Sequence, residues 1–215
     1  MQTIIGLVCL ALLMMWAEPA SAQKTHELTV RYHKSIELTD DKVKRILAEA
    51  SEVLQRRSCN VRFTLKQPIR PFESQDTPKE IKNKHDRDAV HREDSDVKVV
   101  STIVFCRPDQ AVDLGCAWDP PPNDELHPQR RSMIVVDPDA VPGRPQRRLK
   151  FSGVLWAHEF GHMTGLFHRK EPNALMTGCG VETYTVKIKR HECNCFRGGH
   201  GSCPHEPDTQ VTCGR

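Results

Sequence analysis

The residues best suited to chemistry stand close together, in the segment HEFGHMTGLFH at 158–168. His158 and His162 are spaced so that a helix would bring both imidazoles to one face, where they could hold one metal ion. Glu159 would lie one step round that helix, too far round for a ligand but close enough to hold a metal-bound water. His168 requires the chain to turn, and Gly165 is the residue that can take positive φ and end the helix.

Three neutral imidazoles around one tetrahedral ion leave a fourth position open. This is how catalytic zinc is held, whereas structural zinc has all four positions closed by protein. A helix with two histidines is usually only a helix, and HExxH by itself also occurs by chance. The glycine and the third histidine, each at a fixed offset, make the longer motif more specific and favour a zinc site.

The motif resembles that of the metzincin zinc proteases, HExxHxxGxxH, at every fixed position. The family also has a methionine-bearing turn beneath the metal, and the resemblance assigns this Met-turn to Met176. Residues 172–176, PNALM, are most similar to the matrixin branch. Arg169 departs from it, since matrixins usually have Ser after the third histidine, adamalysins Asp, astacins Glu and serralysins Pro. Gly178 stands where astacins and serralysins place a tyrosine ligand, so those two branches fit poorly and the branch stays open.

The resemblance implies an α+β fold of the zincin, metzincin-like type. In that fold a twisted, mostly parallel sheet is backed by helices, and the active-site helix lies at the floor of the cleft. Residues 23–165 would form an upper subdomain. Residues 166–215 would form a small, Cys-rich lower subdomain that contains the Met-turn.

The resemblance also implies zinc-dependent hydrolysis of peptide bonds. One Zn²⁺ ion would activate a water, and Glu159 would accept its proton and pass it to the leaving amine. Metzincin substrates pair with an edge strand. The corresponding residues here are Gly115, Cys116, Ala117 and Trp118. By the same analogy, two side chains after the Met-turn would line the pocket past the scissile bond, Val181 and Tyr184.

Two other classes of protein compete with the protease. One is a secreted binding or toxin-like protein on a catalytically silent metzincin scaffold, against which the intact Glu159 argues. The other is a disulfide-linked structural protein in which zinc only stabilises the fold. A fourth protein ligand to the metal would support that class. Absence of any Glu159-dependent activity would separate both from a protease.

The first residues indicate export from the cell. An apolar run from Ile4 to Trp16 precedes a small-residue site, Ala20-Ser21-Ala22, and predicts a signal peptide at 1–22. We therefore expect a secreted, extracellular protein in which residues 23–215 form a single catalytic domain.

The cysteines support the same compartment. The chain has nine, of which Cys9 falls in the predicted signal peptide, so the even remainder predicts four disulfides. Cys193 and Cys195 are too close to pair with each other and should bridge to different partners. The same tail could also form a structural zinc knot with its histidines, but an oxidising compartment favours disulfides.

The composition limits the partners. The formal net charge is only +3, and the basic residues are scattered, which argues against nucleic-acid binding. No later segment is apolar enough for a membrane anchor. We expect a monomer that acts on a peptide or protein substrate. The chain leaves little room for a prodomain, so latency would come from a separate protein inhibitor or from the segment near Gln23.

Apolar patterns predict the elements that position the motif. Strands are expected at 27–33 and 60–66, with a buried central strand at 97–106 and another strand in SMIVVDP at 132–138. An amphipathic helix is expected at 39–57, capped by Thr39 or Asp40.

Two further helices are expected, and a last segment could be a helix or a strand. The capping-box pattern that begins at Thr77 predicts a short surface helix. The helix that carries the motif should begin between Arg148 and Ser152. Residues 182–192 would form a final helix by family analogy, or a strand by their alternation.

One charged segment suggests a second metal site. Its candidate ligands are His85, Asp88, His91, Asp94 and Asp96. A solvated charged face is the favoured interpretation of such a segment.

Overall fold

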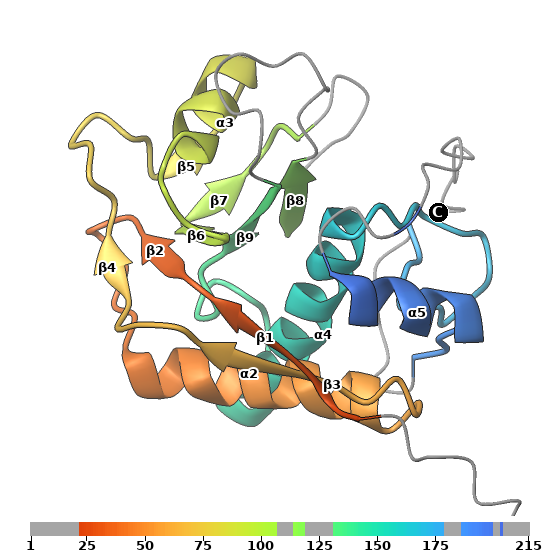
Figure 1. The fold of residues 1–215 in the computed structure, drawn as a ribbon. Coiled ribbons are helices and arrows are strands. Elements are labelled where there is room, and N and C mark those ends of the chain that lie inside the picture. Colours follow the sequence, from red (N-terminus) through yellow and green to blue (C-terminus); the bar gives the residue numbers. More distant parts are fainter. Residues whose placement is uncertain (1–21, 107–113, 119–130, 179–185, 200–202, 204–215) are drawn as a thin grey trace, which may run out of the picture.

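The computed structural model describes residues 22–106, 114–118, 131–178, 186–199 and 203. Its main layer is a five-stranded sheet in the order β4-β2-β6-β9-β8 (Figure 1). In chain order its strands are β2 Val30–Tyr32, β4 Arg70–Pro71, β6 Val97–Val100, β8 Gly115–Trp118 and β9 Ser132–Val136. Strands β4, β2, β6 and β9 are mutually parallel, and only β8 runs antiparallel to its neighbour β9. The predicted mostly parallel sheet is therefore present.

In the described part of the chain, four helices accompany the sheet. They are α2 Asp40–Gln55, α3 Lys84–His91, α4 Pro145–Met163 and α5 Arg190–Gly198. Figure 1 shows α2 and α4 together on one side of the sheet and α3 on the other. The predicted helix at 39–57 is confirmed as α2, and its N-cap is Thr39, whose side chain accepts a hydrogen bond from the Lys42 N–H.

β6 and β9 bury mainly apolar side chains on both faces, because helices cover both faces of the sheet, and Lys98 and Ser132 are their polar exceptions. On β6 and β9, alternate residues pack toward α2 and α4, and the others pack toward α3. The first set is Val97, Val99, Met133 and Val135, and the second set is Val100, Ile134 and Val136. This explains why these strands read as continuous apolar runs rather than as alternating ones.

Two predicted strands are each split in the structure. Two small parallel sheets lie beside the main one, β1 Lys24–Leu28 with β3 Val61–Leu65, and β5 Glu80–Ile81 with β7 Thr102–Ile103. The strand predicted at 27–33 breaks at Thr29, whose N–H and hydroxyl both donate to the Asp96 carboxylate at 2.7 Å. The strand predicted at 97–106 breaks at Ser101, whose N–H donates to the Lys79 carbonyl at 2.7 Å.

The helix predicted after Thr77 begins later than expected. The Thr77 hydroxyl does not cap a helix but donates to the buried Glu93 carboxylate at 2.6 Å. The chain then forms β5, and α3 starts only after Asn83, whose side chain accepts from the Asp86 N–H. The capping-box pattern was therefore misleading, because its threonine has a partner distant in the sequence.

Two other helix boundaries also differ from the predictions. α4 begins at Pro145, three residues before the earliest predicted start, since proline is well suited to the first helical position. α5 begins at Arg190, so neither a helix nor a strand fills 182–192 as predicted. Lys187 forms only an isolated bridge with Ala174, and residues 179–185 lie outside the described residues.

Disulfides cross-link the described part of the chain at three places. They join Cys59 to Cys193, Cys106 to Cys116, and Cys195 to Cys203. The prediction that Cys193 and Cys195 bridge to different partners is confirmed, and their sulfurs do not form the alternative zinc knot. The other two cysteines of the predicted framework, Cys179 and Cys213, lie outside the described residues. None of the helices that the structure describes has the length and apolar character needed to cross a membrane.

Lys98 places a basic side chain inside the protein. It lies in the middle of β6 and is only 1% exposed. Its Nζ donates to the Ser95 carbonyl at 2.5 Å. Burial lowers the pKa of Lys98 to about 7, although the nearby carboxylates of Asp96 and Glu93 oppose the shift.

We predict that this lysine makes stability depend on pH. Between pH about 7 and 10.5 the unfolded chain keeps the Lys98 proton and the folded chain releases it, so the free energy of unfolding rises with pH. Lys98→Met should remove this rise and stabilise the protein at pH 7 by on the order of 1 kcal/mol or more. Urea denaturation at several pH values measures both effects. An identical pH slope in the wild type and the variant would contradict the prediction.

Candidate metal centre

The motif lies on α4 and on the turn that follows it. Ala157 and Phe160 are fully buried and fix that side of the helix in the core, so His158 and His162 share a different face. α4 ends at Met163, and Gly165 adopts a φ of 100°, as the sequence predicted. The turn brings the following loop back along the helix.

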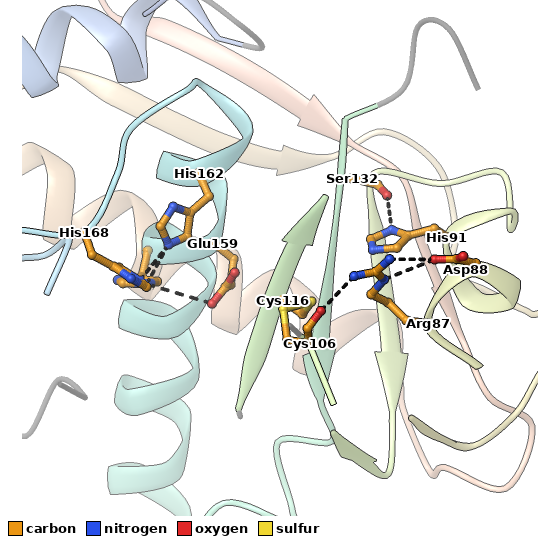
Figure 2. Close-up of a disulfide and its surroundings, with 10 residues drawn as sticks. Arg87, Asp88, His91, Cys106, Cys116, Ser132, Glu159, His162 and His168 are labelled. Atoms are coloured by element: carbon orange, nitrogen blue, oxygen red, sulfur yellow. Dashed lines mark hydrogen bonds and ion pairs between the residues drawn. A yellow bond between two sulfur atoms is a disulfide. The ribbon is translucent and has the colours of Figure 1, made fainter. Parts of the chain in front are cut away.

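The three imidazoles converge on one point. Their Nε2 atoms are separated by 3.1 Å (His158 to His162), 2.9 Å (His162 to His168) and 3.2 Å (His158 to His168). Figure 2 shows the rings of His162 and His168 pointing toward each other. Tetrahedral zinc with bonds of about 2.0–2.1 Å separates its ligand nitrogens by about 3.3 Å, so the spacing fits such an ion. Among the residues that the structure describes, only these three form a cluster able to hold a metal.

Backbone carbonyls orient two of these rings. Nδ1 of His158 donates to the Leu175 carbonyl at 2.6 Å, and Nδ1 of His162 donates to the Leu166 carbonyl at 2.7 Å. Since each neutral ring carries one proton, both Nε2 atoms present lone pairs to the centre.

The protonation state of His158 also suits a metal ligand. Burial, aided by the neighbouring His168, lowers the pKa of His158 to about 4, and the bond to Leu175 only partly opposes this. The imidazole is therefore neutral near pH 7. Three ring nitrogens at these distances, two of them turned toward the centre by their Nδ1 bonds, form a donor set that fits a zinc ion.

Glu159 lies beside the cluster without joining it. Its carboxylate is 4.0 Å from Nε2 of His158, and the residue is only 4% exposed. Figure 2 shows the side chain on the side of α4 that faces β8. There it meets Gly115, where an added Cβ would overlap the Glu159 carboxylate. A glycine is required at this position so that the strand and the carboxylate can approach each other closely.

β8, which contains the predicted substrate strand, is the edge strand of the sheet. The Val136 N–H donates to the Leu114 carbonyl at 3.0 Å, so the alternation of an antiparallel pair turns the backbone groups of Gly115 and Ala117 away from β9, toward the edge that no other described strand pairs with. On the opposite face of the strand, Cys116 is tied to Cys106. The structure thus places the predicted strand next to Glu159. Val181 and Tyr184 lie outside the described residues.

Met176 lies under the motif helix, where the resemblance placed the Met-turn. Its side chain is fully buried, and a Cβ added at Gly161 would overlap the Met176 sulfur. The Met176 carbonyl accepts the Arg169 N–H at 2.7 Å, which joins this turn to the residue after His168.

The candidates for a second metal site do not converge. Asp88 pairs with Lys84 and Arg87, and His91 bonds to the Ser132 hydroxyl at 2.9 Å (Figure 2). Asp96 is held by Thr29. These side chains hold the loops and α3 in place, and the segment is not simply a solvated charged face, because His91 is buried.

Some residues of the centre were not predicted. The carbonyls of Leu166 and Leu175 cannot be inferred from side-chain type, because any residue supplies a carbonyl. In the sequence, Arg169 stands out only because it differs from the residues that the metzincin branches have after the third histidine. Its buried partner Glu192 carries no signal in the sequence, because the two meet only after folding.

No protein-family model matches the sequence, and no curated protein matches it. Among solved structures, the fold is similar to that of archaemetzincin from Methanopyrus kandleri. The two chains are 14% identical, the match covers 85% of this chain and 97% of that chain, and the TM-score is 0.52. The comparison supports a metzincin-type fold, and the likeness to matrixins gains no support from it. At this identity the similarity concerns the fold alone, because one fold can host many different activities.

Proposed function

We propose that this protein is a secreted zinc-dependent endopeptidase. One observation carries the proposal: three histidine Nε2 atoms lie within 2.9–3.2 Å of one another, with the Glu159 carboxylate beside them. No fourth His, Cys, Asp or Glu joins this cluster among the described residues. Three neutral ligands with an open position are typical of catalytic zinc.

The three histidines would hold the ion through Nε2. Bound zinc supplies Lewis acidity, which lowers the pKa of a water to about 7 and polarises a substrate carbonyl. The carbonyls of Leu166 and Leu175 keep two of the rings in the tautomer that offers Nε2 to the ion.

Glu159 would move the protons of the reaction. Its carboxylate would accept a proton from the attacking water and deliver it to the leaving amine. α4 and β8 enclose the side chain, which limits its rotation and favours one orientation toward the reacting groups.

The outer edge of β8, which pairs with no strand in the described part of the chain, favours an extended peptide as substrate. Backbone groups of Gly115 and Ala117 would pair with the substrate main chain and place a bond inside the peptide next to Glu159. Such pairing is independent of substrate side chains, so it suits an endopeptidase whose sequence preference is set elsewhere. The disulfides and the predicted signal peptide support action outside the cell. We further propose that the protein acts as a monomer.

The activity is tested with the disulfide-bonded protein and a mixed peptide library. We predict internal cleavage that a chelator abolishes and added zinc restores. Glu159→Gln should lower kcat/KM by at least about 100-fold, because it removes the proton acceptor. Cleavage that persists in this variant would exclude the proposed role of Glu159. A zinc-loaded wild type that cuts nothing would favour the catalytically silent scaffold.

Zinc binding can be measured without any substrate. We predict that zinc at about 1,000 times its Kd stabilises the protein by about 4 kcal/mol, seen as a rise in Tm. His162→Ala should lose this rise because it removes a ligand, whereas Glu159→Gln should keep it. Equal Tm shifts in wild type and His162→Ala would mean that the ion binds elsewhere.

Gly115 tests the close approach between β8 and Glu159. Gly115→Ala should lower kcat/KM by at least about 10-fold, because the new methyl group displaces the carboxylate by a fraction of an ångström or more. Zinc affinity should stay unchanged, since no ligand moves.

Gly143→Ala is the matched control for this substitution. Gly143 differs from Gly115 in having a positive φ, of 121°, and it lies before α4, where an added Cβ would approach only the Arg147 side chain. This variant should lose stability and keep its activity. Full activity in Gly115→Ala would rule out the proposed constraint on Glu159.

A further inference from the structure

Arg169 joins three segments around the candidate metal centre. Its Nε lies 3.0 Å from the Glu192 carboxylate of α5, and its Nη1 lies 2.5 Å from Glu171. Its Nη2 donates to the Lys187 carbonyl at 2.8 Å. The side chain of Arg169 is 15% exposed and that of Glu192 only 3%, so this is a largely buried ion pair.

From these contacts we infer that Arg169 and Glu192 form a positioning pair for the zinc ligands. The inference rests on the proposed zinc centre and names residues beyond the motif. Neither residue touches the point where the histidines converge. They would act through the backbone on both sides of the centre.

The first route leads to His168. Arg169 is the next residue in the chain, and its N–H donates to the Met176 carbonyl at 2.7 Å. Backbone and side chain of Arg169 are therefore both fixed, the backbone by the Met-turn and the side chain by α5. His168 is therefore followed directly by a residue, Arg169, that has little freedom to move.

The second route leads to His158. The Lys187 carbonyl accepts from Arg169 and also from the Leu175 N–H, at 2.9 Å. The carbonyl of that same Leu175 accepts from Nδ1 of His158. A shift of Arg169 would therefore disturb the group that orients the first histidine as well as the third.

α5, which contains Glu192, is firmly anchored to the rest of the protein. Glu192 also accepts the Lys189 N–H at 2.6 Å, which holds the first turn of the helix. The adjacent Cys193 is bonded to Cys59, just after α2. Cys195 is bonded to Cys203, whose N–H donates to the carbonyl of Thr164, directly after α4. α5 is thus covalently tied to the core, and Arg169 transfers that rigidity to the ligands.

Arginine suits this position better than lysine. Its planar fork can reach two carboxylates and a carbonyl at once, and it stays charged at every physiological pH. Lysine would keep the charge but could not make all three contacts. Loss of an outer-shell partner of a metal site typically costs about 10- to 100-fold in metal affinity.

The test measures the zinc affinity of the disulfide-bonded protein by competition with a chromogenic chelator, each variant well below its own Tm. We expect Arg169→Lys and Glu192→Gln each to bind zinc about 10- to 100-fold more weakly than wild type. The double variant Arg169→Met, Glu192→Leu removes both charges, so no unpaired buried ion should prevent it from folding. We expect its zinc affinity to be lower than that of the wild type, like that of the single variants.

Arg31→Lys is the matched control. Arg31 also makes three polar contacts, but with two carbonyls, those of Asp94 and Pro71, and one carboxylate, that of Glu73, and it lies on β2. This variant should keep wild-type zinc affinity. The inference is overturned if the folded Arg169 and Glu192 variants bind zinc as wild type does, or if Arg31→Lys loses as much. A wild type without zinc affinity would instead refute the zinc centre itself.

Discussion

The hydrogen bonds from two histidine rings to backbone carbonyls are the interaction on which the site depends. They hold His158 and His162 in the tautomer whose Nε2 lone pairs face the centre. Their acceptors, Leu166 and Leu175, belong to the loop after α4. The geometry of the centre is therefore set by how that loop folds, and the helix alone would not be enough.

The rest of the fold serves this requirement. α4 packs against both the sheet and α2, so the first two histidines lie on a rigid element. The loop is held by the hydrogen bond between Arg169 and Met176 and by the ion pair of Arg169 with Glu192 on α5. Disulfides link α5 to the core. β8 then closes on Glu159 from the sheet side, through the small residue Gly115. Catalytic geometry of this kind needs support from several directions.

Local patterns predicted the parts of the fold that local forces control. The α2 stripe, the Thr39 cap, the turn at Gly165 and the spacing of the three histidines all follow from neighbours in sequence. The predictions failed where a distant partner decides the outcome. Thr77 bonds to Glu93 instead of capping a helix, and Thr29 and Ser101 break strands through long-range bonds. The Arg169–Glu192 pair belongs to this second group, because tertiary contacts override local preference.

The most direct test of this account is anomalous diffraction at the zinc edge from crystals grown with zinc. We predict one strong peak at the point where Nε2 of His158, His162 and His168 converge, with no fourth protein ligand. A peak bound by a fourth protein side chain would identify a structural zinc site. The absence of any peak between the three rings would contradict the metal centre altogether.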